Sequence, residues 1–334
     1  MLTKKLIFNL EPTFRCNLGC EMCPRFSSDD AYLDMPMETH QRICEGMQHA
    51  HTVDYTGWGE PLLHGGIYDM VRMAHERGCA TTMTSNGTAL SAANSRRLIE
   101  AGLDRLTVSI DGLSPQTYDT IRIGASLEKV EANLRRLSRL IAQCGSTLEL
   151  GIAFTIQEVN ADEVSSTADW TASVGAQVLH LKQLNVPSNA EDWQRGLLKY
   201  RLQPAQRNGN RLAAVEEAIQ AALSRASQLG LQTHLHSQLP LTPEMEPRYC
   251  LAAPLDTVYF SFQGQVAPCC HFGHHVSRYF EGGFHPPSAL FYGDIGRNSF
   301  EEIWNSPSFA AFRRGFERKD YPAECRTCYL LYGK

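Results

Sequence analysis

The sequence predicts an α/β protein, in which a partial barrel of six strand–helix units, a partial (β/α)6 TIM barrel, is followed by a small irregular C-terminal module. Three observations lead to this prediction. Short apolar runs alternate with amphipathic helical patterns from residue 5 to about residue 182, as in folds built around a parallel sheet. Prolines break this pattern from residue 240 onward. Most of the eleven cysteines gather near the two ends of the chain.

Six segments of the N-terminal part have the composition of buried or half-buried strands. They are residues 5–11, 52–58, 80–85, 105–110, 148–156 and 176–184. Helical patterns fill the gaps between them, at residues 37–50, 67–77, 91–101, 127–144 and 161–174. In the fourth of these helices, Val130, Leu134 and Leu137 recur at helical spacing, which predicts a face that covers the sheet. Because the C-terminal ends of the strands form the active rim of such barrels, we expect functional residues there.

The chain is expected to divide into three parts. Residues 1–184 form the partial barrel, and residues 185–239 supply a loop over its rim and a linking helix near residues 211–229. Residues 240–334 form the small module, with a hairpin that turns at Gln263 and Gly264 and two short helices. A module this short and irregular usually needs a bound metal or a covalent cross-link for stability, and cysteines at both of its ends can supply the ligands.

Composition excludes several classes of protein. The 334 residues carry 31 basic and 36 acidic side chains, so no excess of positive charge favours binding to nucleic acid or a membrane surface. No apolar run approaches a membrane span, and the N-terminus lacks the features of an export signal. We therefore expect a cytoplasmic protein, in which an odd number of cysteines argues against a disulfide framework. Cys44, Cys79 and Cys144 stand apart and are interpreted as small buried hydrophobes.

Three cysteines, Cys16, Cys20 and Cys23, lie within eight residues directly after the first predicted strand. Thiolates at this density select zinc or an iron–sulfur cluster. A structural zinc site wants a fourth ligand, and no further cysteine lies within twenty residues on either side. An iron–sulfur cluster held by three thiolates keeps one iron open to a small molecule.

The segment CNLGCEMC resembles the CxxxCxxC motif of radical S-adenosylmethionine (SAM) enzymes. The resemblance implies a [4Fe–4S] cluster on the three cysteines, with the fourth iron bound by the methionine moiety of SAM. It also implies an electron donor such as flavodoxin or ferredoxin, and a 5′-deoxyadenosyl radical that abstracts hydrogen from an unactivated C–H bond. Met22 stands where the family usually has an aromatic residue, and its thioether can pack on adenine.

Further segments at the ends of the predicted strands resemble motifs of the same family. The cofactor-binding residues that the resemblance implies are Gly57, Gly59, Glu60, Asn86, Ser109, Asp111 and Arg122. The GWGEP segment matches a motif whose backbone and carboxylate contact the methionine amino group. The TSNG segment matches the TNG motif, and the SIDG segment matches a motif that contacts ribose or substrate. The arginine stands where related members bind the methionine carboxylate.

A second set, Cys250, Cys269, Cys325 and Cys328, resembles the twitch module, the shortened form of the SPASM extension of radical SAM enzymes. The resemblance implies one auxiliary [4Fe–4S] cluster, while a four-cysteine zinc site has the same ligands. Cys270 is left over. It either packs against the hairpin or donates a hydrogen atom to a substrate radical, as radical epimerases require.

The layout is similar to that of radical SAM dehydrogenases and epimerases of aminoglycoside pathways, and so implies a polar small molecule of the aminoglycoside, aminocyclitol or sugar type. Epimerisation and dehydrogenation both remain open. A maturase of a ribosomal peptide is the alternative, although such relatives commonly carry an extra N-terminal recognition domain and this chain has only 15 residues before Cys16. A non-catalytic zinc-binding module is a remote alternative.

Other polar residues near the rim are candidates for substrate contact or for satisfied barrel positions. They are Gln157, Asn160, His180, Lys182 and Gln183. The histidines of the C-terminal module are interpreted as mostly surface residues. They are His271, His274, His275 and His285.

Overall fold

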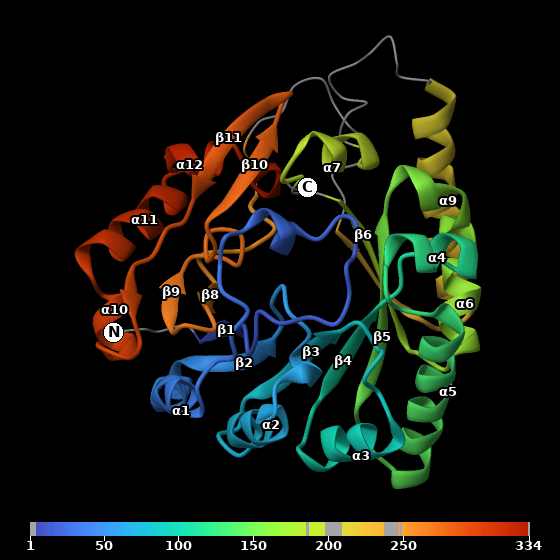
Figure 1. The fold of residues 1–334 in the computed structure, drawn as a ribbon, viewed down its shortest axis with the longest axis horizontal. Helices are drawn as coiled ribbons and strands as arrows, with labels where there is room; N and C mark the ends of the chain where they lie inside the picture. Colours follow the sequence, from blue (N-terminus) through green and yellow to red (C-terminus); the bar gives the residue numbers. More distant parts are fainter. Residues whose placement is uncertain (1–4, 185–186, 198–208, 237–246, 248, 333–334) are drawn as a thin grey trace.

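One sheet of ten strands curves through the part of the chain that the computed structural model describes, residues 5–184, 187–197, 209–236, 247 and 249–332 (Figure 1). The six predicted strands are all present. They are β1 (Leu6–Leu10), β2 (Ala50–Tyr55), β3 (Ala80–Ser85), β4 (Arg105–Ser109), β5 (Glu149–Ile156) and β6 (Val178–Gln183). Each pairs in parallel with the next, which confirms the predicted α/β partial barrel.

Helices lie on the outside of this curved sheet (Figure 1). They are α1 (Met37–Glu45), α2 (Ile67–His75), α3 (Ala92–Glu100), α4 (Pro115–Ile121), α5 (Leu127–Cys144), α6 (Thr167–Ser173) and α9 (Gly209–Gln228). Helix α7 (Ala190–Arg195) follows β6 and lies beyond the end of the sheet, at the top of the view in Figure 1. Short 3-10 turns occur at Pro24–Ser27, Met47–His49, Pro61–Leu63, Glu158–Ser166 and Tyr329–Leu331. The helix expected over residues 161–174 is therefore half 3-10 and half α6. The short helix α4 was not predicted, although Ser114 caps it by accepting a hydrogen bond from the backbone N–H of Thr117.

Two strands that the sequence did not predict as part of the barrel extend its sheet. β7 (Gln232–His236) pairs in parallel with β6 at one edge, and β8 (Thr257–Phe260) pairs in parallel with β1 at the other. β9 (Gln265–Ala267) and β12 (Gly293–Asp294) continue from β8. The predicted hairpin is therefore real, but it continues the barrel sheet, because its first strand satisfies the open edge of β1.

The rest of the C-terminal part packs beside β8 and β9 (Figure 1). It contains the strands β10 (Val276–Phe280) and β11 (Gly283–Ser288) and the helices α10 (Phe300–Trp304), α11 (Pro307–Glu317) and α12 (Ala323–Arg326). The ring of Phe300 lies 4.7 Å from that of Phe8 in β1, so α10 closes the core against the first strand. The two helices expected near residues 300–304 and 309–316 are thus confirmed.

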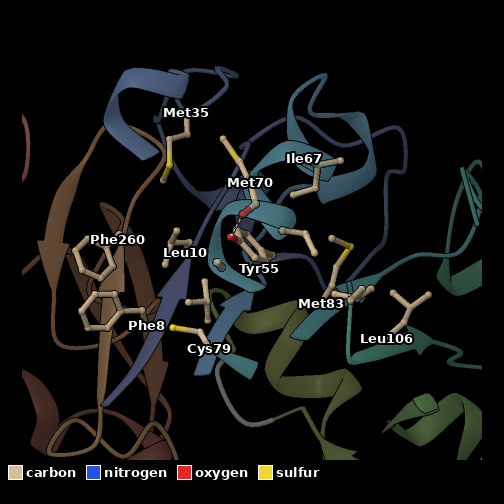
Figure 2. Close-up of a cluster of buried hydrophobic side chains, with 14 of the residues drawn as sticks. Phe8, Leu10, Met35, Tyr55, Ile67, Met70, Cys79, Met83, Leu106 and Phe260 are labelled. Atoms are coloured by element: carbon tan, nitrogen blue, oxygen red, sulfur yellow. Dashed lines mark hydrogen bonds between the residues drawn. The ribbon is translucent and has the colours of Figure 1, made fainter. Parts of the chain in front are cut away.

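One of the hydrophobic clusters contains buried residues of both the N-terminal and the C-terminal part (Figure 2). Phe8 and Phe260 meet in it from neighbouring strands, with ring centres 5.0 Å apart. The hydroxyl of Tyr55, fully buried there, donates to the carbonyl of Met70 at 2.6 Å. Cys44 and Cys79 are buried as predicted, but Cys144 is exposed at the end of α5, so the interpretation of that cysteine was wrong.

The loop expected over the rim, residues 185–209, lies largely outside the described residues. Its described part contains α7, whose Trp193 stacks on Tyr329 with ring centres 5.7 Å apart. The linking helix expected near residues 211–229 is α9. Among the helices that can be described, none has both the length and the apolar composition of a membrane span.

Candidate active site

The loop that carries Cys16, Cys20 and Cys23 crosses the rim directly after β1. Two backbone hydrogen bonds hold it against the C-terminal end of α4 and the residues that follow, from Gly19 N–H to the carbonyl of Ile123 and from Glu21 N–H to that of Ile121. The three thiols are half-buried and close enough for each to influence the ionisation of another. Burial raises the pKa of Cys20 to about 11, so binding of iron there would release a proton.

Glu60 joins the segment that follows β2 to the C-terminal end of β3. One of its carboxylate oxygens accepts from the hydroxyl of Ser85 at 2.8 Å, and the other accepts from the backbone N–H of Asn86 at 2.7 Å. The Asn86 amide reaches the Sγ of Cys16 at 3.8 Å. The structure therefore brings two predicted SAM-binding residues to the first cysteine loop, while their contact with SAM stays a prediction.

Gly57 and Gly59 are required by the packing of this segment. A methyl group on Gly57 would lie 2.3 Å from the Cγ of Glu11, and one on Gly59 would lie 2.1 Å from the carbonyl oxygen of Thr13. Because the second contact is with backbone, a larger residue would displace the GWGEP segment from the end of β1.

Asp111 and Arg122 form a buried ion pair beside this loop. The two side chains meet at 2.6 Å, and the other oxygen of Asp111 accepts from the backbone N–H of Thr155 at 2.9 Å. Both lie near the thiol of Cys20. Ser109 and Met22 are partly exposed at the same edge of the sheet. The predicted cofactor residues thus converge on one region, although Arg122 spends part of its hydrogen-bonding capacity on Asp111.

The second cysteine set surrounds one small cavity. Cys250, Cys269, Cys325 and Cys328 all line it, together with apolar side chains such as Phe272 and Phe316. Within the described residues, no group of three or more His, Cys, Asp or Glu side chains is arranged to hold a single metal ion. Four thiols spaced around a dry cavity fit a multi-iron cluster, whose four irons each take one thiolate.

Cys270 lies between this cavity and the barrel. Its thiol is partly exposed and near the carboxylates of Glu11 and Asp54. It is also close enough to Lys182 in β6 to affect the ionisation of that side chain. The leftover cysteine is therefore near both the auxiliary cysteines and the interior of the barrel.

The interpretation of the histidine run as surface was wrong for His274. The side chain is 1% exposed, because the loop after Cys270 folds inward under the rim. Its Nε2 lies 3.1 Å from Glu11 and its Nδ1 lies 2.8 Å from Asp30. Although burial alone would lower it, these two carboxylates raise the pKa of His274 to about 9. The imidazole is therefore a buried cation between two anions.

Glu11 completes this network and was missed by the sequence reasoning. Its carboxylate accepts from the backbone N–H of Trp58 at 2.8 Å and from the hydroxyl of Tyr259 at 2.8 Å. Trp58 belongs to the GWGEP segment and Tyr259 to β8. The network thus links the predicted SAM motif to the C-terminal part. The only available signal was a carboxylate at the end of a buried strand.

A polar cavity of about 450 Å³ lies on the concave face of the sheet. Alternate residues of β2 to β7 line it, among them Asp54, Arg105, Glu149, His180, Lys182, His234 and His236. His180 and Lys182 therefore face a cavity, as one of the two sequence readings expected. The side-chain amide of Asn160 instead donates to the carbonyls of Asp111 and Thr155, and its oxygen accepts from the backbone N–H of Gln157. Gln157 and Gln183 are buried and do not line this cavity.

Comparison with known proteins agrees with both cysteine sites. A model of the radical SAM superfamily matches residues 10–169, and a model of the SPASM iron–sulfur cluster-binding domain matches residues 250–329. The chain is a radical SAM protein with a SPASM domain. Its cofactors are SAM and [4Fe–4S] clusters, and the residues present at the two cysteine sites fit them.

Several known proteins are similar to this chain over most of its length. The tungsten-containing aldehyde ferredoxin oxidoreductase cofactor-modifying protein of Pyrococcus furiosus is 26% identical over 96% of this chain and 86% of its own length. The solved structure of Streptococcus suis SuiB bound to precursor peptide SuiA has a TM-score of 0.69 at 14% identity, covering 99% of this chain and 71% of that one. For anSMEcpe with bound AdoMet the TM-score is 0.66 at 16% identity, covering 97% and 88%. The two structural likenesses concern the fold alone.

Proposed function

We propose that this radical SAM protein abstracts a hydrogen atom from a small polar substrate of the sugar, aminocyclitol or aminoglycoside type, and so epimerises or dehydrogenates it. The observation that carries the proposal is the polar cavity of about 450 Å³, which has the size of a small-molecule site. Its lining residue Lys182 lies near Asp111 on the SAM side and near Cys270 on the auxiliary side.

When bound, SAM and its cluster supply the radical chemistry, and the chain supplies placement. Cys16, Cys20 and Cys23 would hold the first cluster, and the cavity formed by Cys250, Cys269, Cys325 and Cys328 would hold the auxiliary cluster. The hydrogen bond between Glu60 and Asn86 joins the GWGEP and TSNG segments beside the loop of Cys16. The closed apolar surroundings of the second cluster exclude water.

Cys270 is proposed as the hydrogen-atom donor if the reaction is an epimerisation. It is the one cysteine outside the two ligand sets that approaches the barrel interior among the described residues. In a dehydrogenation the substrate radical would instead lose a proton and one electron, for which the auxiliary cluster would be the acceptor, and no thiol donor would be needed. The two outcomes can be separated by the products.

The direct test is anaerobic reconstitution followed by counting of iron and sulfide, and then an assay of 5′-deoxyadenosine with candidate sugars and aminocyclitols. The proposal expects about eight irons per chain, because each [4Fe–4S] cluster contributes four. Cys325→Ala should retain about four, with Cys144→Ala as the control that keeps about eight. Four-thiolate zinc and no iron–sulfur absorbance would support the non-catalytic zinc module instead.

A peptide maturase is the second candidate. The observation in its favour is the fold similarity to SuiB, which was solved with its precursor peptide. Formation of 5′-deoxyadenosine that depends on a peptide encoded beside this protein, and on none of the sugars, would establish this alternative. The required electron donor, such as flavodoxin or ferredoxin, is common to both functions.

A further inference from the structure

The polar cavity on the concave face of the sheet has two ends, one at the starts of the strands and one toward their C-terminal ends, and the two ends differ in charge. Arg105 and Glu149 lie at its lower end, because they begin neighbouring strands and are register partners. Lys182 is the register partner of Thr155 in β5. Thr155 follows Glu149 by six residues, so Lys182 lies roughly 20 Å further along the sheet than Glu149. The basic and acidic residues of the lower end therefore balance each other, and Lys182 belongs to the end near the SAM motifs.

Three imidazoles accompany Lys182 at this upper end. His180 and His234 are register partners and stack with ring centres 4.8 Å apart, and His236 is the register partner of Lys182. Burial lowers the pKa of His180 to about 3, so it is a neutral imidazole that offers one N–H donor. The three imidazoles and the ammonium together make a set rich in hydrogen-bond donors.

The ammonium of Lys182 has no ion pair or hydrogen bond within the described part of the chain. Asp54 is the carboxylate with the strongest influence on its ionisation, but Oδ1 of Asp54 accepts from the hydroxyls of Thr56 and Thr82, at 2.7 and 2.8 Å, and Oδ2 accepts from the side-chain amide of Asn9 at 3.3 Å. Burial lowers the pKa of Lys182, which expresses the free-energy penalty of a half-buried ammonium without a close anion. A bound anion would relieve that penalty.

We propose that Lys182, His180, His234 and His236 bind an oxyanion of the substrate, a carboxylate or a phosphate. The statement that the bound anion belongs to the substrate rests on the proposed function. The binding of an anion at these residues does not depend on it. It narrows the substrate to acidic sugars or related acids. A simple polycationic aminoglycoside would bring ammonium groups toward Lys182 and is disfavoured here. Charge-assisted hydrogen bonds from a lysine and from imidazoles are a common way to hold such groups in proteins.

The test measures binding to the reconstituted full-length enzyme without SAM, using inorganic phosphate and acetate as separate probes at constant ionic strength. At least one probe should bind saturably, and Lys182→Gln should weaken that binding by about tenfold or more. Lys182→Arg keeps the charge and should retain most of the affinity. Lys129→Gln, at an exposed position of α5, is the matched control.

Binding of phosphate alone would indicate a phosphorylated substrate, and binding of acetate alone a carboxylic acid. No saturable binding of either probe, or equal affinity in Lys182→Gln, would overturn the inference. If Lys182→Gln does not fold, His234→Gln on the exposed edge strand β7 replaces it, with a severalfold loss expected. A wild-type protein that binds an anion but forms no 5′-deoxyadenosine from SAM would refute the proposed function and leave the anion site standing.

Discussion

The indole of Trp58 stacks on the imidazole of His274, with ring centres 4.2 Å apart and planes inclined by 26°. Trp58 belongs to the segment predicted to bind SAM, and His274 to the loop that follows the auxiliary cysteine Cys269. The contact is strengthened by charge, since a protonated imidazole is attracted to the face of an indole. The C-terminal part therefore packs directly against the segment predicted to bind SAM.

Loss of the charge on His274 should therefore destabilise the protein at high pH. Its pKa is raised to about 9 from an unfolded value of 6.5, so the stabilisation is fully present below pH 6.5 and is lost as the pH rises through about 9. The shift corresponds to roughly 3 kcal/mol. Urea unfolding between pH 6 and 10 should show this loss in the wild type and a much flatter profile in His274→Gln. The exposed neighbour His275, changed to Gln, should keep the wild-type profile.

Gly59→Ala should disrupt the GWGEP segment. The added methyl would lie 2.1 Å from the backbone oxygen of Thr13, which no side-chain rotation can relieve. We expect a loss of about 1–3 kcal/mol in the free energy of unfolding, with weaker SAM binding by calorimetry. Gly65→Ala is the matched control, because no atom lies within 4 Å of the methyl it adds. Equal stability of the two variants would contradict the packing argument.

Asp111→Asn should leave the guanidinium of Arg122 buried without a counter-ion. Removal of one member of a buried pair costs about 3–5 kcal/mol, whereas an exposed pair contributes less than about 1 kcal/mol. The midpoint temperature of thermal unfolding should therefore be lower in Asp111→Asn than in the wild type. It should change little in Asp69→Asn, which breaks the exposed pair with Arg72. A small effect in both variants would show that water reaches Arg122.

Cys270→Ala should separate the two proposed reactions. For an epimerase, the variant should cleave SAM and retain about eight irons per chain, but give no epimer and incorporate no solvent deuterium into the substrate. For a dehydrogenase, product formation should persist. Cys144→Ala is the control, because it removes an exposed thiol at the end of α5 that belongs to neither cysteine set. An epimerase that turns over normally without Cys270 would exclude this residue as the donor.

The sequence was most informative where local pattern and local chemistry coincide. Alternating apolar runs located β1 to β6, and the spacing of Cys16, Cys20 and Cys23 led to the radical SAM family that the family model confirms. Such features are encoded within a few residues. The C-terminal iron–sulfur module was also recognised, because a hairpin and a terminal CxxC mark it in the sequence. The individual cluster ligands stay predictions.

Features that depend on distant partners were missed. β7 reads QTHLH, has no apolar face, and is a strand because β6 offers a free edge. His274 is polar and sits in a histidine-rich stretch, so its burial follows only from the carboxylates of Glu11 and Asp30, more than two hundred residues earlier. No local pattern reports such a pairing. The same holds for the alignment of His180 with His234 across two strands.

The parallel pairing of β8 with β1 also bears on biosynthesis. Residue 7 pairs with residue 257, so one edge of β1 has no partner until about 250 further residues have been synthesised. Parallel pairing over such a separation is slow to form, and a nascent chain with an open edge strand is prone to aggregate. Chaperone co-expression should therefore raise the soluble yield of this protein.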